Sequence, residues 1–268
     1  METVETKLKV FMPDGSIETY RRSIHGPRKI AIQGPPKSGK SHLAATAPRG
    51  PKFFYDPAGR LDSLEGMPDV FGKTYYDSVN PSKSTAWDMI EQDTNMFEYH
   101  HAKGDPIPGT FIYDDIDILM DRAMRKCLVD GLTQVKKLKA GSNIYLAPAN
   151  WYPKAELDMV GNLIARGIEM GSDVIAIFHE RDEETADSTS EDKKFTGKKS
   201  VHPPRAAVFL PLFNEYWRCV PTGDGKYVVH TKSSYIFDGA TCLDVEETEE
   251  ADITKMVNKS EERKRQNG

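Results

Sequence analysis

The fold of this chain is decided by residues 34–41, which read Gly34-Pro35-Pro36-Lys37-Ser38-Gly39-Lys40-Ser41. This stretch matches the phosphate-loop pattern G-x-x-x-x-G-K-[ST] at every fixed position. An apolar, β-rich run, Lys29–Gln33, precedes it, and an alanine-rich helical stretch, Lys40–Ala47, follows it. The order of strand, loop and helix is the context that the motif requires. The sequence therefore predicts a loop whose backbone N–H groups surround phosphate oxygens at the positive end of a helix.

Each residue type in the loop suggests a role. Lys40 would reach the β- and γ-phosphates of a nucleotide, and the Ser41 hydroxyl would bind Mg²⁺. The predicted ATP site comprises Gly34, Pro35, Pro36, Lys37, Ser38, Gly39, Lys40, Ser41 and His42. The alternative interpretation is a chance glycine turn before a helix, with no ligand.

Beyond the loop, apolar strands alternate with helical segments. The predicted strands are Lys52–Asp56, Thr74–Tyr76, Thr110–Tyr113 and Asp173–Phe178. The predicted helices are Trp87–Ala102, Ile116–Leu138 and Pro153–Met170. This alternation is typical of an α/β protein with a mainly parallel sheet flanked by helices.

Both ends of the chain carry hairpin patterns. Lys7–Met12 and Ser16–Arg22 flank a Pro13-Asp14-Gly15 turn, and Glu215–Pro221 and Lys226–Thr231 flank a glycine-containing turn. The polar stretch Arg181–His202 has no apolar period and is predicted to be a mobile loop. We therefore expect an N-terminal β-hairpin over residues 1–25, a core over 26–240 and a flexible, acidic-then-basic tail over 241–268.

Composition limits the possible classes of protein. The 268 residues are 38% hydrophobic and 29% charged, as expected for a globular protein. A net charge of −5 argues against a globally basic coat for nucleic acid. Three cysteines without paired spacing fit a reducing compartment and exclude a zinc knuckle. The acidic N-terminus and the absence of a long apolar run lead us to expect a cytoplasmic protein without a membrane partner.

A second nucleotide-binding motif is predicted at the end of strand Thr110–Tyr113. Asp114 follows this strand and would hold Mg²⁺ through water. The alternative is that Asp114, Asp115 and Asp117 only cap the next helix and complement its dipole.

Together these motifs resemble the phage RecA-like single-strand annealing ATPases of the Sak group. The resemblance covers roughly residues 28–232 and rests on the phosphate loop with its following Leu43-Ala44-Ala45-Thr46, the strand ending at Asp56 with Gly59 soon after, and the strand ending Ile177-Phe178-His179-Glu180. It implies a RecA-like core that binds ATP, Mg²⁺ and single-stranded DNA and promotes annealing during phage recombination. It further implies assembly into a ring or filament, a single-strand-binding protein as a partner, and the host cytoplasm as the location.

The resemblance also suggests catalytic residues, with one departure. RecA-like proteins place a catalytic glutamate two residues beyond the Asp that ends the second core strand, and here that position holds Ala58. Asp115 is the predicted substitute base, and Asp62 is a weaker one. His179 lies where such proteins place a sensor of the γ-phosphate, so the predicted catalytic set is Asp115, Lys40 and His179. For His179 the alternative is a strand-end histidine without ligand contact.

Basic and aromatic residues indicate where DNA would bind. The first candidate set lies in or just after the polar stretch and comprises Lys193, Lys194, Phe195, Lys198, Lys199 and Arg205. Lysines neutralise backbone phosphates, and an aromatic ring stacks on a base without reading sequence. Because the stretch also holds many acids, a solvated, charge-balanced loop is the alternative. A second candidate set is Lys136, Lys137 and Lys139 with Asn150, Trp151 and Tyr152, although the two aromatic residues would also serve as core anchors of the next helix.

Three functions remain open on this evidence. The first is an ATP-dependent annealing or recombination protein with slow, DNA-stimulated hydrolysis. The second is a small-molecule kinase, against which the lack of an arginine-rich lid weighs. The third is an ATP-binding adaptor that hydrolyses little, which Ala58 favours. Because RecA-type sites usually lie between subunits, Lys232 and Arg218 are candidates for a basic residue that acts on a neighbouring subunit.

Overall fold

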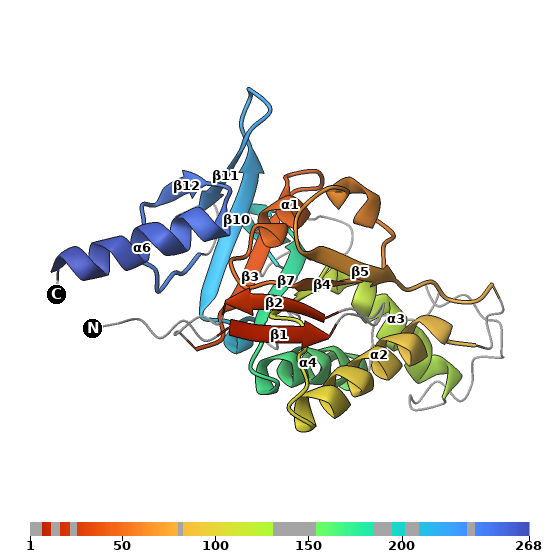
Figure 1. Ribbon diagram of the computed structural model, residues 1–268. Coiled ribbons are helices and arrows are strands. Elements are labelled where there is room, and N and C mark those ends of the chain that lie inside the picture. The colour runs from red at the N-terminus through yellow and green to blue at the C-terminus, as the bar shows by residue number, and fades with distance from the viewer. Residues whose placement is uncertain are drawn as a thin grey trace. The chain divides into compact units, whose positions relative to one another are not determined.

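The structure is a computed structural model that describes residues 7–11, 17–21, 26–79, 83–130, 154–184, 195–201, 209–234 and 239–267 (Figure 1). The chain divides into two compact units. The first unit contains the segment up to Pro27 and Arg49–Val174, and the second contains Arg28–Pro48 and everything from Ile175 onward.

The main sheet has eight strands, which are β3 (Lys29–Gly34), β4 (Lys52–Asp56), β5 (Val70–Thr74), β6 (Thr110–Tyr113), β7 (Asp173–His179), β10 (Glu215–Pro221), β11 (Tyr227–His230) and β12 (Thr248–Glu250). Their order is β12-β11-β10-β3-β7-β6-β4-β5. β4 pairs in parallel with β5 and β6, and β10 pairs in parallel with β3, whereas β11 is antiparallel to both β10 and β12. The predicted α/β fold with a mainly parallel sheet is confirmed, and so is the hairpin near residues 215–231.

The described helices are α1 (Lys40–Ala45), α2 (Thr85–Ala102), α3 (Ile116–Val129), α4 (Lys154–Glu169) and α6 (Ile253–Asn267), with short 3₁₀ turns at η1 (Leu61–Leu64) and η4 (Leu210–Leu212). The predicted helix over Ile116–Leu138 therefore ends at Val129, and residues 131–153 lie outside the described residues. Among the helices of the described ranges, none has the length and apolarity needed to span a membrane.

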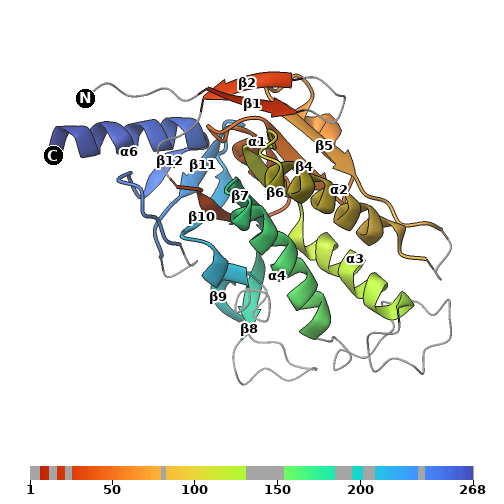
Figure 2. The same cartoon turned by 60° about the horizontal axis from the view of Figure 1, so that its bottom comes forward.

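The core of the first unit is aromatic. Phe53 on β4 packs edge-on against Phe97 of α2, with ring centroids 5.0 Å apart, and Tyr55 stacks on Tyr113 of β6 at the same separation. The buried Tyr113 hydroxyl donates a hydrogen bond to the Leu163 carbonyl of α4, 3.0 Å away. Figure 2 shows α3 beside α4, which it contacts directly. These contacts hold α2 and α4 on strands β4 and β6, and thereby fix the point where β6 ends.

The edge strand of this unit was predicted in the wrong place. The sequence suggested Thr74–Tyr76, but the strand is β5, Val70–Thr74, and it pairs with β4 in register from Lys52 with Val70 to Asp56 with Thr74. A Cβ atom on Gly72 would lie 2.6 Å from the Phe54 carbonyl oxygen, so this strand requires a glycine at its centre. Glycine is depleted in strands and often marks a close approach of two backbones. Because Gly72 lies at the centre of β5, the sequence pattern did not predict a strand there.

Two shorter hairpins complete the strands. β1 (Lys7–Phe11) pairs with β2 (Ile17–Arg21) in an antiparallel ladder, which confirms the predicted N-terminal hairpin. The predicted mobile loop over Arg181–His202 is wrong in part, since β8 (Arg181–Glu184) pairs antiparallel with β9 (Phe195–Ser200). Residues 185–194 and 202–208 lie outside the described residues. Both strands are polar and show no alternation of apolar residues. The side-chain pattern therefore does not reveal them, and their backbone pairing defines the hairpin.

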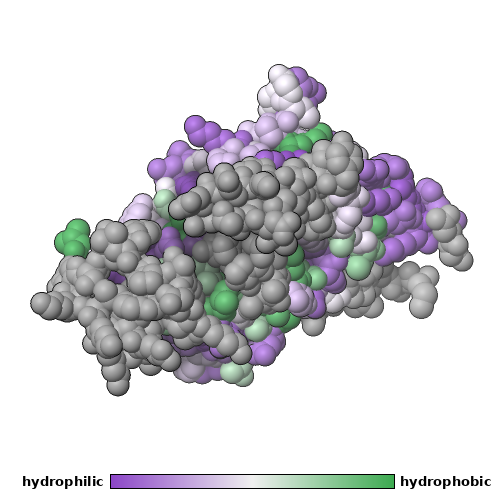
Figure 3. Space-filling model, turned by 180° about the vertical axis from the view of Figure 1, so that it is seen from behind, coloured by the Kyte–Doolittle hydropathy of each residue, from purple (hydrophilic) through white to green (hydrophobic). Residues whose placement is uncertain are grey.

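The C-terminal segment is also ordered where a flexible tail was predicted. Helix α6 buries Ile253, Met256, Val257 and Ser260, which recur at the spacing of one helix face. The Ile253 N–H donates to the Thr46 hydroxyl just after α1, 2.8 Å away, and the Thr254 hydroxyl donates to the Thr46 carbonyl at 2.6 Å. The rest of α6 is polar or charged, and Figure 3 shows its outer surface as hydrophilic. Because only three apolar residues lie among these charges, the composition resembles that of a solvated tail.

We predict that Met256→Ala lowers the free energy of unfolding by about 2–5 kcal/mol, because a buried side chain leaves a cavity. Lys264→Ala on the exposed face of α6 is the matched control and should change stability by less than about 0.5 kcal/mol. Urea denaturation measures both variants. Equal, small effects would mean that α6 is not packed on the fold.

Candidate functional site

The phosphate loop links the end of β3 to the start of α1. Gly39 adopts φ 81°, in the left-handed region that glycine enters without steric cost, and its carbonyl accepts the Leu43 N–H at 2.8 Å to begin the helix. The exposed Lys37 also has positive φ, 60°, which is uncommon for a residue with a Cβ atom. The segment between β3 and α1 is thus a tight loop with two residues of positive φ, as a loop between a strand and a helix was predicted here.

Two glycines of the motif are required by packing from β10 and β11. A Cβ atom on Gly34 would collide with the Cys219 carbonyl oxygen on β10 and lie 2.7 Å from Ser38 Oγ. A Cβ atom on Gly39 would lie 2.7–2.9 Å from three ring atoms of Tyr227 on β11. Strands from the C-terminal part of the chain therefore touch the loop at both of its fixed glycines.

The Cys219 thiol fixes the middle of the loop. It is buried and donates to the Ser38 carbonyl, with Sγ 2.9 Å from the oxygen. Burial raises the pKa of this thiol to about 12, although the nearby Lys40 charge lowers it in part. Cys219 is therefore protonated at neutral pH, and its hydrogen bond to the Ser38 carbonyl holds the middle of the loop in place.

The Lys40 ammonium group lies against the beginning of the loop. Its Nζ donates to the Gly34 carbonyl at 2.9 Å and to the Pro35 carbonyl at 2.7 Å, and the side chain is 6% exposed. Ser41 is half-buried at the first turn of α1, and His42 is exposed. The positive charge of Lys40 is thus placed at the loop, as its predicted contact with phosphates requires.

The end of β7 lies beside the same loop. The Glu180 N–H donates to the Gly34 carbonyl at 3.4 Å, so the half-buried His179 is one residue from a direct contact with the phosphate loop. This neighbourhood is compatible with a γ-phosphate sensor, and that role of His179 stays a prediction.

Arg218 forms an ion pair with Glu180 in its own unit. Its Nε and Nη2 donate to the two Glu180 carboxylate oxygens at 2.7 and 2.9 Å, and the two side chains are only 16% and 7% exposed. A bidentate pair of this kind is geometrically specific and holds the guanidinium within its own unit. The suggested role of Arg218 on a neighbouring subunit stays a prediction, as does that of the exposed Lys232.

The two predicted acids follow β6 in the first unit, and the peptide bond between them is cis. The Asp114 N–H donates to the Tyr55 carbonyl at 3.0 Å, which continues the ladder with β4. One Asp115 carboxylate oxygen accepts the Asp117 N–H at 2.8 Å, and the Asp115 carbonyl accepts the Leu119 N–H at 3.0 Å. Asp115 therefore caps α3, as the alternative interpretation expected.

Arg60 is a neighbour of Asp115 that the sequence did not reveal. Its Nη1 lies 3.6 Å from Asp115 Oδ2, and its side chain is 45% exposed beside an aspartate that is almost fully buried. The Asp56 carboxylate accepts backbone N–H groups of Ala58, Arg60 and Leu61, and so shapes the turn that positions Arg60. Ala58, at the position of the expected glutamate, lies in this turn, and Asp62 is exposed on η1.

The predicted magnesium site offers oxygen ligands, which suit Mg²⁺. Mg²⁺ prefers carboxylate and hydroxyl oxygens, which Asp114 and Ser41 supply. Asp114 belongs to the first unit and Ser41 to the second, and their joint binding of one ion stays a prediction. Over the described ranges, the structure contains no cluster of three or more His, Cys, Asp or Glu side chains that would hold a metal ion.

The predicted DNA-binding residues are described only in part. Phe195, Lys198 and Lys199 lie on β9, and Lys199 is half-buried. Lys193, Lys194 and Arg205 lie outside the described residues, as does the whole second set: Lys136, Lys137, Lys139, Asn150, Trp151 and Tyr152. Asp182 pairs with Lys199 in the backbone register of the β8–β9 hairpin, so acidic and basic positions face each other there.

Comparison with known proteins finds similarity among solved structures only. No protein-family model and no curated protein matches the sequence. Among solved structures, the crystal structure of the RadB recombinase is similar, with a TM-score of 0.41 and 10% sequence identity, over 76% of this chain and 80% of that chain.

Proposed function

We propose that this chain is an ATP-binding protein of DNA recombination that binds single-stranded DNA and promotes strand annealing. The observation that carries the proposal is the phosphate loop. Its full motif lies between a buried strand and a helix, its glycines take the required close contacts, and the Lys40 charge is held at its start. Anions bind such loops because backbone N–H groups and the helix N-terminus both favour negative charge.

The proposed ATP site assigns a task to each residue. The backbone N–H groups of residues 37–41 would surround the phosphate oxygens, and Lys40 would contact the β- and γ-phosphates. Ser41 and Asp114 would hold Mg²⁺, which neutralises charge on the β- and γ-phosphate oxygens. Asp115 would orient or deprotonate the attacking water, and His179 would report the state of the γ-phosphate to the adjoining β8–β9 hairpin.

The proposed DNA site uses the basic residues of and around that hairpin. Lysines at 193, 194, 198 and 199 would neutralise phosphates, while Phe195 would stack on a base. Such contacts bind single strands without reading their sequence, which suits annealing. We further propose a ring or filament of several copies.

A second function, an ATP-binding adaptor with little hydrolysis, is favoured by the contacts of Asp115. Its carboxylate already caps α3 and faces Arg60, and Ala58 supplies no acid. The Asp117 N–H and the Arg60 guanidinium take up positions on this carboxylate that an attacking water would otherwise use.

Lys40→Ala should abolish measurable ATP binding, because it removes the charge assigned to the phosphates. Lys264→Ala, which removes an equal charge from the exposed face of α6, should bind ATP as the parent does. Isothermal titration with ATP and Mg²⁺ measures both, and circular dichroism checks that each variant is folded. Equal ATP affinity in the two variants would refute the proposed nucleotide site.

Replacing Lys193, Lys194, Lys198 and Lys199 together by Ala should weaken binding of a single-stranded oligonucleotide. Each lost phosphate contact should reduce the slope of log affinity against log salt by about 0.7. The control replaces four exposed lysines elsewhere, Lys83, Lys103, Lys255 and Lys264, and so makes the same change in net charge. Gel shifts with and without ATP provide the measurement. If both variants lose affinity equally, the hairpin region has no special part in binding DNA.

Asp115→Asn separates the two functions, because asparagine still caps a helix but is not a base. If the chain hydrolyses ATP through Asp115, turnover should fall by about 10²–10⁴-fold while ATP affinity and stability change little. If the chain is an adaptor, turnover should be slow in the parent, unaffected by this change, and raised by Ala58→Glu. Asp88→Asn, which makes the same change at an exposed position of α2, is the control. Fast turnover in the parent that survives Asp115→Asn would contradict both versions.

A further inference from the structure

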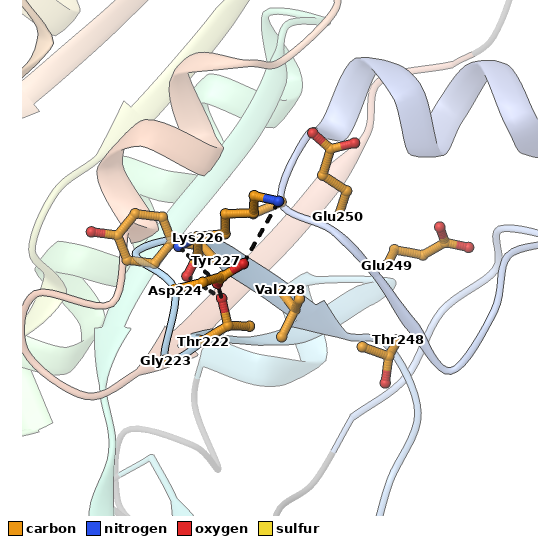
Figure 4. Close-up of a pocket in the computed structure, with 10 residues that line it drawn as sticks. Thr222, Gly223, Asp224, Lys226, Tyr227, Val228, Thr248, Glu249 and Glu250 are labelled. Atoms are coloured by element: carbon orange, nitrogen blue, oxygen red, sulfur yellow. Dashed lines mark hydrogen bonds and ion pairs between the residues drawn. The ribbon is translucent and has the colours of Figure 1, made fainter.

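A cleft opens beside the phosphate loop in the second unit. It has a volume of about 960 Å³ and lies between the turn that joins β10 to β11, residues 222–224 and 226–228, and the segment 248–251, which contains β12 (Figure 4). Small-molecule sites typically measure about 300–1,000 Å³. The cleft is thus large enough for a ligand of nucleoside size.

Tyr227 joins this cleft to the phosphate loop. It lines the cleft, and its Cγ, Cδ1 and Cδ2 would all lie within 2.9 Å of a Cβ atom on Gly39. Near-equal distances to these three atoms mean that the face of the ring covers Gly39. Figure 4 shows Tyr227 at one end of the cleft and Glu249 and Glu250 at the other. Tyr227 therefore links the cleft to the residue that precedes Lys40.

The charges around the cleft are paired and leave no excess of positive charge to hold phosphate. Its ionisable lining residues are Asp224, Glu249 and Glu250 against the single basic Lys226. Asp224 lies 3.6 Å from Lys226, while Glu249 and Glu250 pair with Lys259 and Lys255 at 2.6 and 2.8 Å. Carboxylates are common partners of ribose hydroxyls, and a tyrosine ring offers an apolar face to a base. The lining is thus suited to the uncharged part of a nucleotide.

We propose that this cleft binds the base and ribose of the nucleotide whose phosphates occupy the phosphate loop, with the Tyr227 ring in contact with the base. The proposal rests on the proposed nucleotide binding and adds the residue that distinguishes a nucleotide from bare polyphosphate. The placement of charge supports it, since the Lys40 ammonium group lies at the phosphate loop, whereas each carboxylate that lines the cleft is paired with a lysine.

The test compares ATP with inorganic tripolyphosphate, both with Mg²⁺, by isothermal titration. Parent protein should bind ATP more tightly than tripolyphosphate. Tyr227→Ala should weaken ATP binding by about 5- to 150-fold, the range for loss of one base–aromatic stack, and should leave tripolyphosphate binding within about twofold. Tyr227→Phe keeps the ring and should match the parent with both ligands.

Each other outcome has a distinct meaning. Equal losses for both ligands would show that the ring only supports Gly39, and unchanged ATP affinity would show that it does not touch the base; either overturns the proposal. A parent protein that binds neither ligand would refute the nucleotide site itself. Photolabelling of the parent with 8-azido-ATP needs no variant, and it should mark peptides that contain residues 222–228 or 248–251. Labelling confined to other peptides would overturn the proposal.

Discussion

Close contact between the phosphate loop and the β10–β11 hairpin is the constraint on which the second unit depends. The loop meets the Cys219 carbonyl at Gly34 and the Tyr227 ring at Gly39, and the Cys219 thiol bonds to Ser38 between them. Any side chain at either glycine would push the hairpin away. Since a six-residue helix such as α1 is marginal by itself, tertiary packing of this kind must hold it and its loop in place.

What the sequence predicted correctly is what short stretches of chain encode. The phosphate loop is specified by eight consecutive residues, and the strands β3, β4 and β6 are short apolar runs that end at recognisable breaks. The hairpin near residues 215–231 has a glycine-containing turn with local hydrogen bonds, such as the Thr222 N–H to the Lys226 carbonyl at 2.7 Å. Motif and periodicity suffice for such features, because the partners lie within a few residues of each other.

What the sequence did not predict depends on partners far along the chain. Glu180 and Arg218 are 38 residues apart, and no local sequence pattern predicts that they form a buried ion pair. Arg60 meets Asp115 only because the turn on Asp56 and the end of β6 come together in the fold. In the sequence, nothing distinguishes Tyr227 from other strand residues. Its contact with Gly39 is seen only in the fold. The candidate site could thus be predicted at its phosphate end, whereas its surroundings required the fold.

The hydrogen bonds between α6 and Thr46 have a consequence for how the protein is made. The two partners of the Ile253–Thr46 bond are 207 residues apart, so the helix that follows the phosphate loop leaves the ribosome long before the segment that binds its end. At about 5–20 residues per second, synthesis separates them by roughly 10–40 s. During that interval α1 exists without its last partner. A nascent chain would therefore complete its phosphate-loop unit only after residues 253 and 254 have left the ribosome.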